Sequence, residues 1–392
     1  MKRSRAIFLA LGLAMLVAVQ AISTSRLLSR DGARIQWPEP GSRHALSFSA
    51  SGDAWMAPGP SGISGLWLQA WDEDKPGSSP LSFPAVRPVV TDRGRPLFPL
   101  ATWSAKASLP SAGNWVLRLV AVGQDGRRIA SAPRTMVAVD SGELFDSGFS
   151  SWSAPHLAAI AAIVALALLV AYFARKGGVA WLEKAAPFIA LAMWLNELAY
   201  QSYWMAVGGW SQSVSLMIQM CGLSIVCLPI CLFMKDGPRR TWLADVLYFW
   251  GIAGAAQAIL TPDIGASGFP SYRYFSFFIS HGLIIAAVVA LFASGAARIT
   301  KRSLGRCLIA SNLVLIPVYA IDRLLALIPP YIPGNYFALG YPPPTGSPID
   351  LLVSIFGPSP RYIVGLEIMG FLVFLLLWLP WAIADRPSSG SA

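Results

Sequence analysis

Two groups able to do nucleophilic chemistry stand in apolar stretches long enough to cross a membrane. Cys221 lies in SVSLMIQMCGLSIVCLPICLF, and His281 lies in YRYFSFFISHGLIIAAVVALF. A thiol beside an imidazole is typical of covalent acyl-transfer catalysts, because the imidazole removes the thiol proton. Polar groups are costly in hydrocarbon, so those that occur there are often functional. The pair therefore predicts an intramembrane active site.

Each of these residues also has an ordinary explanation. A single cysteine in a membrane helix is usually a small packing residue, and a histidine often hydrogen-bonds to a neighbouring helix. Their depth favours a shared role, however. At 1.5 Å per residue, Cys221 is about 12 Å from Ser213 and His281 about 12 Å from Arg273, the expected outer ends of their helices.

Further polar residues are expected in the same outer half of the bilayer, where they would orient the imidazole or stabilise an oxyanion. This supporting polar network comprises Glu197, Gln201, Gln219, Gln257, Asp263 and Glu367. Glu197 and Gln201 are one helical turn apart, so they have the alternative of simply joining neighbouring helices. The chain has no metal-ligand spacing, nucleotide-binding loop or redox cysteine pair, so we expect no metal and no cofactor.

The composition predicts a polytopic α-helical membrane protein. Hydrophobic residues make up 55% of the 392 residues and charged residues only 13%, whereas soluble proteins are more polar. A helical span needs about 20 apolar residues. We predict a seven-helix core with spans near 155–174, 182–202, 213–234, 241–260, 273–297, 304–328 and 361–384.

The N-terminal residues 1–22 predict a cleavable signal peptide or, equally well, a retained signal anchor. Lys and Arg recur on alternate loops, which places those loops in the cytoplasm by the positive-inside rule. The seven-helix domain is expected over 151–386, with a short cytoplasmic tail at 387–392, in a bacterial inner membrane. The net charge of +10 is explained by anionic lipid near these loops, and no nucleic-acid partner is expected.

Residues 23–150 differ in kind and are expected outside the cytoplasm. Short alternating runs such as GLWLQAW and NWVLRLVAV are separated by turn signals, including Asp125-Gly126, which predicts strands and a hairpin. The length suits one immunoglobulin-like sandwich. It holds none of the four cysteines. We expect it to be a spacer or a cap, with a minority role in binding an envelope partner or a lipid headgroup.

Long motifs between about 181 and 384 resemble the YwaF family of bacterial integral membrane proteins, relatives of the eukaryotic transmembrane protein 164 family. The motifs are NELAYQ at 196–201, MIQMCGLSIVCLP at 217–229, DVLYFWGIAGAAQAILTPD at 245–263, FPSYRYFSFFISHGLI at 269–284, GNYFALGYPP at 334–343 and GPSPRYIVGLE at 357–367. The resemblance implies a phospholipid acyltransferase in which Cys221 and His281 carry the chemistry. Gln219 stands where the family usually has a histidine.

The sequence therefore predicts acyl transfer through a thioester on Cys221, with a membrane phospholipid or lysophospholipid as substrate. A different class of function stays open at this point. The same polar residues would suit a non-enzymatic lipid or small-molecule carrier, although no inverted repeat supports one. An envelope scaffold is the third alternative.

Overall fold

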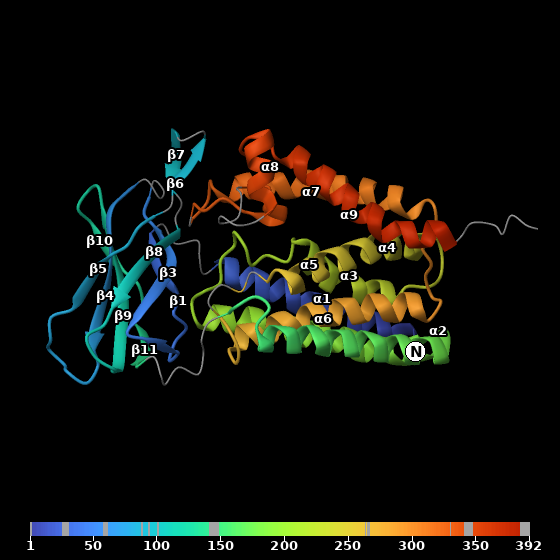
Figure 1. The fold of residues 1–392 in the computed structure, drawn as a ribbon, viewed down its shortest axis with the longest axis horizontal. Coiled ribbons are helices and arrows are strands. Elements are labelled where there is room, and N and C mark those ends of the chain that lie inside the picture. The colour runs from blue at the N-terminus through green and yellow to red at the C-terminus, as the bar shows by residue number, and fades with distance from the viewer. Residues whose placement is uncertain are drawn as a thin grey trace, which may run out of the picture.

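The protein was examined as a computed structural model. It describes residues 2–25, 31–57, 62–87, 89–92, 95–99, 102–140, 149–262, 264, 267–329, 331–340 and 348–384. A helical bundle forms one part and a group of β-sheets the other. The sheets stand at one end of the bundle and the N-terminus at the opposite end (Figure 1). We call the end that carries the sheets the outer end.

Six helices in the described residues are long and apolar enough to cross a membrane. They are α1 (Lys2–Ser25), α2 (Ala154–Ala206), the continuous run Pro238–Leu260, α6 (Tyr272–Ala293), α7 (Ser303–Leu325) and α9 (Ile363–Ala384). The run Pro238–Leu260 consists of α4 (Pro238–Phe249), the π-helix η3 (Trp250–Gly254) and α5 (Ala255–Leu260). The shorter elements are α3 (Met220–Phe233), η4 (Tyr336–Ala338) and α8 (Pro348–Phe356). The prediction of a polytopic membrane protein is confirmed.

Helix α2 is too long for one pass. Its 53 residues would extend about 80 Å if straight, more than twice the thickness of a bilayer core. Gly178 breaks it, because its φ of 58° lies in the left-handed region that glycine adopts without a steric penalty.

Contacts with α6 show that α2 turns back at this break. Near its start, the hydroxyl of Tyr274 donates to the carbonyl of Pro155 at 2.5 Å. A Cβ placed at the break would lie 3.9 Å from the carbonyl oxygen of Ser294, just beyond the end of α6. The later half returns to the start of α6, where the rings of Tyr203 and Tyr272 lie 4.4 Å apart. Helix α2 is therefore a hairpin whose two halves match the predicted spans 155–174 and 182–202.

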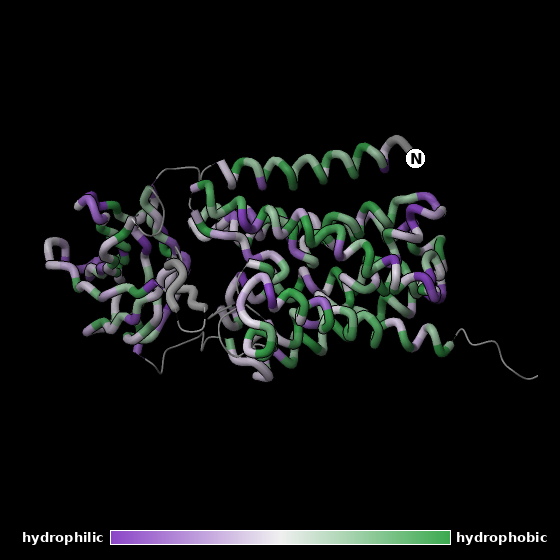
Figure 2. Tube along the Cα trace, turned by 90° about the horizontal axis from the view of Figure 1, so that it is seen from above, coloured by the Kyte–Doolittle hydropathy of each residue, from purple (hydrophilic) through white to green (hydrophobic). Residues whose placement is uncertain are grey.

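The N-terminal helix α1 packs against this hairpin. Gly12 faces the indole of Trp194 so closely that a Cβ there would lie 2.1 Å from the ring, and Phe8 stacks on the same indole with ring centroids 5.4 Å apart. Leu16 is buried. Figure 2 shows α1 lying along the flank of the bundle, with apolar residues along the helices and mixed polarity in the sheets. Whether α1 is cleaved or retained stays a prediction.

The β-region contains two larger sheets. One has the order β1 (Gly32–Trp37), β3 (Ser47–Trp55) and β8 (Thr102–Ser108). The other has the order β2 (Arg43–Ala45), β11 (Arg134–Val139), β9 (Gly113–Gly123), β4 (Ile63–Asp72) and β5 (Leu81–Pro84), with β10 (Arg128–Ala130) also paired to β9. A separate pair consists of β6 (Val89–Asp92) and β7 (Arg95–Pro99).

Strand β9 explains how this region holds together without a disulfide. Trp115, Leu117, Leu119 and Ala121 are buried at every second position, as expected for one inward face of a strand. They belong to one apolar core shared by both larger sheets. The predicted hairpin is confirmed, since β9 and β10 pair across a turn in which Gly126 has φ 81°. The immunoglobulin-like topology itself stays a prediction.

Candidate functional site

Cys221 lies in the first turn of α3, not in the middle of a long helix. The span predicted at 213–234 becomes helical only at Met220, so counting depth from Ser213 along a helix was wrong. Backbone groups just before α3 bond to other parts of the chain instead of to a helix. The N–H of Leu216 donates to the hydroxyl of Tyr336 at 2.8 Å, and the carbonyl of Ser215 accepts from the amide of Gln201 at 3.1 Å.

Cys221 lies among the first backbone N–H groups of α3. The first N–H groups of a helix have no partner within it, and the first bond into α3 runs from the N–H of Leu223 to the carbonyl of Gln219 at 2.8 Å. The N–H groups of Met220, Cys221 and Gly222 precede it and have no hydrogen-bond partner among the described residues. The start of α3 therefore offers backbone donors to a developing negative charge.

His281 sits within α6 and keeps one ring nitrogen available. Its Nδ1 lies 2.8 Å from the carbonyl oxygen of Phe277. A carbonyl only accepts, so Nδ1 carries the proton and Nε2 of the neutral ring holds the lone pair. Among the residues that the structure describes, Nε2 has no hydrogen-bond partner. With only 9% of its surface exposed, His281 is a buried base whose reactive nitrogen is free.

The π-helix η3 relates Cys221 to His281. Its Gly254 faces α3, where a Cβ would lie 3.4 Å from the Cys221 sulfur. One turn deeper, a Cβ at Gly251 would lie 2.7 Å from a methyl of Val288 and 3.3 Å from a methyl of Ile284, which are two turns and one turn below His281 on α6. These contacts place the thiol and the imidazole within about one to two turns of the same depth. Small residues let helices approach closely, and π-helices are frequent at functional sites.

The thiol and the imidazole share no hydrogen bond in the described part of the chain. Hydrogen bonds between catalytic groups often tighten only when substrate is bound. The shared depth is therefore the geometric relationship that the structure supplies.

The remaining histidines and cysteines make more ordinary contacts. In His156, Nδ1 accepts from the N–H of Trp152 at 2.9 Å and Nε2 donates to the carbonyl of Ile259 at 2.7 Å. Both nitrogens are used, so this ring is structural. Cys231 and Cys307 are fully buried within apolar clusters. Cys221 and His281 differ from them in having a helix start and a free nitrogen.

Two of the predicted supporting residues come together. The amide of Gln201 donates to Glu197 Oε1 at 2.6 Å and to the carbonyl of Ser215 at 3.1 Å. The indole of Trp210 donates to Gln201 Oε1 at 2.6 Å. Glu197, Gln201 and Trp210 are all buried. The network thereby fixes the segment that leads into Cys221.

The other predicted supporting residues lie elsewhere. Gln219 Oε1 accepts from the N–H of Phe337 at 3.3 Å, and Glu367 accepts from Asn312 at 3.2 Å. Gln257 is exposed on α5, and Asp263 lies outside the described residues. Within the described part of the chain, Gln219, Gln257 and Glu367 form no hydrogen bond with Glu197.

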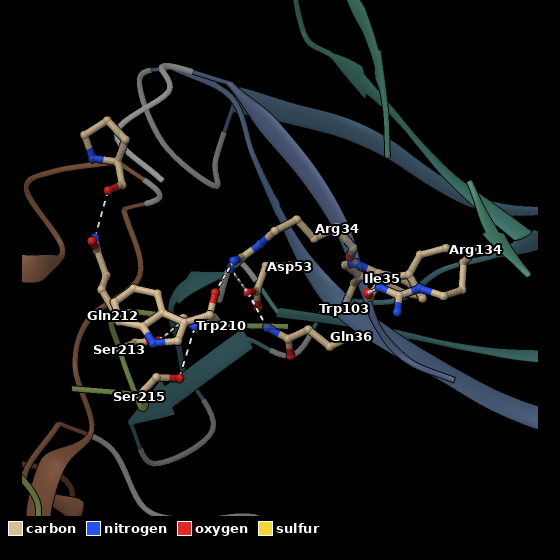
Figure 3. Close-up of polar contacts among 12 residues, drawn as sticks. Arg34, Ile35, Gln36, Asp53, Trp103, Arg134, Trp210, Gln212, Ser213 and Ser215 are labelled. Atoms are coloured by element: carbon tan, nitrogen blue, oxygen red, sulfur yellow. Dashed lines mark hydrogen bonds and ion pairs between the residues drawn. The ribbon is translucent and has the colours of Figure 1, made fainter. Parts of the chain in front are cut away.

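Residues of the β-region reach the buried network directly. Arg34 in β1 forms an ion pair with Asp53 and donates to the backbone carbonyl of Trp210 (Figure 3). Gln36 donates to the same Asp53 carboxylate at 2.7 Å. The result is a continuous chain of hydrogen bonds from Asp53 to Glu197. No short-range pattern in the sequence marks the contact between the two regions, because Arg34 and Trp210 are 176 positions apart.

A second arginine strengthens this contact. Arg134 in β11 donates to the backbone carbonyl of Ile35 and, at 2.6 Å, to that of Val207 beyond the end of α2. Trp55 of β3 is buried in one cluster with Trp204 and Trp210. The β-region is therefore docked on the outer end of the bundle by arginines and tryptophans.

A protein-family model matches the helical bundle. The sequence model of the TMEM164 family matches residues 149–378, which cover the bundle from the start of α2 into α9. No curated protein and no solved structure matches the chain.

Proposed function

Since this chain belongs to the TMEM164 family, we propose that it is a membrane-embedded phospholipid acyltransferase with Cys221 as nucleophile and His281 as general base. The resemblance described from the sequence implies phospholipid acyl transfer, and membership of the family supports that class of reaction. The observation that carries the assignment of residues is the free Nε2 of His281 at the depth of a cysteine that begins a helix.

The first half-reaction transfers an acyl group to sulfur. Nε2 of His281 takes the thiol proton of Cys221, and the thiolate attacks the ester carbonyl carbon of a phospholipid. The backbone N–H groups at the start of α3 stabilise the oxyanion. The acyl C–O bond then breaks, and the departing lysophospholipid oxygen takes the proton from His281.

The second half-reaction reverses these roles. The hydroxyl of an acceptor lysophospholipid gives its proton to Nε2 of His281, and its oxygen attacks the thioester. The C–S bond breaks, and the Cys221 thiolate regains the proton. The enzyme returns to its starting state without any external cofactor.

The buried Glu197 and Gln201 act as positioning residues in this proposal. They hold the segment 210–215 that leads into α3 and so fix the start of the helix that carries Cys221. The docked β-region covers the outer end of the bundle. Its immunoglobulin-like topology and an envelope partner for it stay predictions. The proposed setting is a bacterial inner membrane with residues 23–150 outside the cytoplasm.

The test uses purified protein and a phospholipid labelled in its acyl chain. The wild type should acquire a hydroxylamine-sensitive adduct that maps to Cys221. Cys221→Ser should abolish the adduct, whereas Cys227→Ser, two turns along the same helix, should leave it unchanged. His281→Gln should lower the rate of adduct formation by about 10²-fold or more. A Cys221→Ser protein with full transfer activity would show that Cys221 is not the nucleophile, whereas a wild type that forms neither adduct nor transfer product would point to the carrier or the scaffold.

A further inference from the structure

An open groove runs along the membrane-facing side of the bundle between α5 and α9. It has a volume of about 340 Å³, and its walls include Ile252, Ala253, Ala256, Gln257, Val373 and Leu377. All of them belong to helices long and apolar enough to span the membrane. Hydrocarbon chains of lipids are therefore the molecules that meet this groove first.

The groove is mostly apolar and has two polar residues toward its outer end. Gln257 and Thr261, with the apolar Leu260 between them, lie toward the outer end of α5, whereas Ile252 and Ala253 lie deeper. From Thr261 to Ile252 the helical rise amounts to about 13 Å. A phospholipid has the same order of groups, with polar esters at the edge of the hydrocarbon layer and an apolar chain below.

Gln257 supplies a specific reason for a lipid ligand. Its side chain is exposed, and its amide has no hydrogen-bond partner among the described residues. Its backbone carbonyl accepts from the hydroxyl of Thr261 at 2.9 Å. An amide facing hydrocarbon without a partner is costly. The carbonyl of a lipid ester is the acceptor that this environment offers to the amide N–H groups.

Met220 lies near both the thiol and the groove residues. It belongs to the same apolar cluster as the groove residues Ala253 and Leu377. A Cβ at Gly254 would lie 3.2 Å from the Met220 sulfur and 3.4 Å from the Cys221 sulfur. Methionine is unbranched and adapts its shape readily.

We propose that the groove binds one acyl chain of a membrane phospholipid, with an ester carbonyl on the Gln257 amide and the chain between α9 and the inner turns of η3 and α5. Binding in the groove requires only these residues. The further step, in which Met220 moves and the ester reaches Cys221, rests on the proposed acyl transfer.

The test is photocrosslinking in nanodiscs with a phosphatidylcholine that carries a diazirine in the middle of one acyl chain. The Cys221→Ser protein is used, so that the result does not depend on catalysis. Adducts should concentrate on peptides that contain 252–261 and 373–377. Ala256→Phe fills the groove and should reduce these adducts at least fivefold. Leu376→Phe is the matched control, because Leu376 is 69% exposed on α9 and does not line the groove.

Three outcomes would overturn the proposal. Adducts spread evenly over all lipid-facing helices would indicate ordinary surrounding lipid. Groove adducts unchanged by Ala256→Phe would show that the groove is not the binding site. Crosslinking of these peptides to a copurified membrane protein instead of lipid would show a protein partner. Groove adducts together with a failure of the wild type to acylate Cys221 would refute the acyl transfer but leave the lipid site standing.

Discussion

Arg34 of strand β1 donates a hydrogen bond to the backbone carbonyl of Trp210 at the outer end of the bundle. The same guanidinium is paired with Asp53, whose side chain is only 2% exposed. Burial raises the pKa of Asp53, and the Arg34 charge beside it opposes this shift. Arg34 thus links the β-region to the helical bundle, two parts of the chain whose sequence patterns are very different.

Removing Arg34 should be costly. Arg34→Ala leaves the Asp53 carboxylate buried without its charge partner and should destabilise the protein by about 3–5 kcal/mol. Arg34→Ala/Asp53→Ala should cost less than the sum of the two single variants. Thermal unfolding followed by tryptophan fluorescence measures both. Lys75→Ala, which removes an exposed ion pair to Asp72, is the control and should leave stability nearly unchanged. Additive effects at Arg34 and Asp53 would refute the coupling.

The close packing of η3 on α3 predicts a sensitive glycine. Gly254→Val places methyl groups against Met220 and Cys221 and should destabilise the bundle by about 1–3 kcal/mol through overpacking. It should also change the rate at which a maleimide alkylates Cys221. Gly305→Val is the control, because nothing lies within 4 Å of a Cβ at Gly305. Equal effects of the two substitutions on stability would contradict the described contact.

Substitutions of the two bundle histidines, His156 and His281, should differ in their effects on stability and on acyl transfer. His156→Phe removes the partners of the Trp152 N–H and the Ile259 carbonyl, so we expect a loss of about 2–4 kcal/mol. His281→Phe removes one bond to a helix carbonyl and should cost less than about 1 kcal/mol in stability, while abolishing the adduct on Cys221. The measurements are thermal unfolding and labelled-lipid transfer on both variants. The assignment fails if His156→Phe loses transfer without any loss of stability.

His44 should reduce the stability of the β-region in mild acid. Burial lowers the pKa of His44 from 6.5 to about 4, and its ring lies edge-on against Trp37 at 5.0 Å. The unfolded chain therefore binds a proton below pH 6.5 that the folded chain binds only near pH 4. The contribution of the neutral His44 ring to folding stability is fully present above pH 6.5 and falls as the pH drops toward 4. After allowance for solvent screening, we expect a loss of about 1–2 kcal/mol.

Fluorescence-monitored unfolding between pH 7 and 4.5 measures this effect. His44→Gln cannot take up the proton, so its unfolding midpoint should vary less with pH than that of the wild type. Identical pH profiles for the two proteins would show that another group is responsible.

The sequence alone determined the class of protein and most of its elements. Runs of about 20 apolar residues require helices in a bilayer, because every backbone polar group must be paired internally. Alternating apolar positions such as Trp115, Leu117 and Leu119 likewise predict a strand with one buried face. Sequence also singled out Cys221 and His281, because reactive groups are uncommon in apolar spans.

Only the tertiary structure decided how these elements meet. Periodicity does not reveal that α3 begins only at Met220, because the N–H of Leu216 in the preceding segment bonds to the distant Tyr336. It does not separate the structural His156 from His281 either, because the difference lies in hydrogen bonds to distant segments. The contact of Arg34 with Trp210 joins residues 176 positions apart. Contacts between distant residues form only when the chain packs, so they cannot be predicted from the spacing of residues along the sequence.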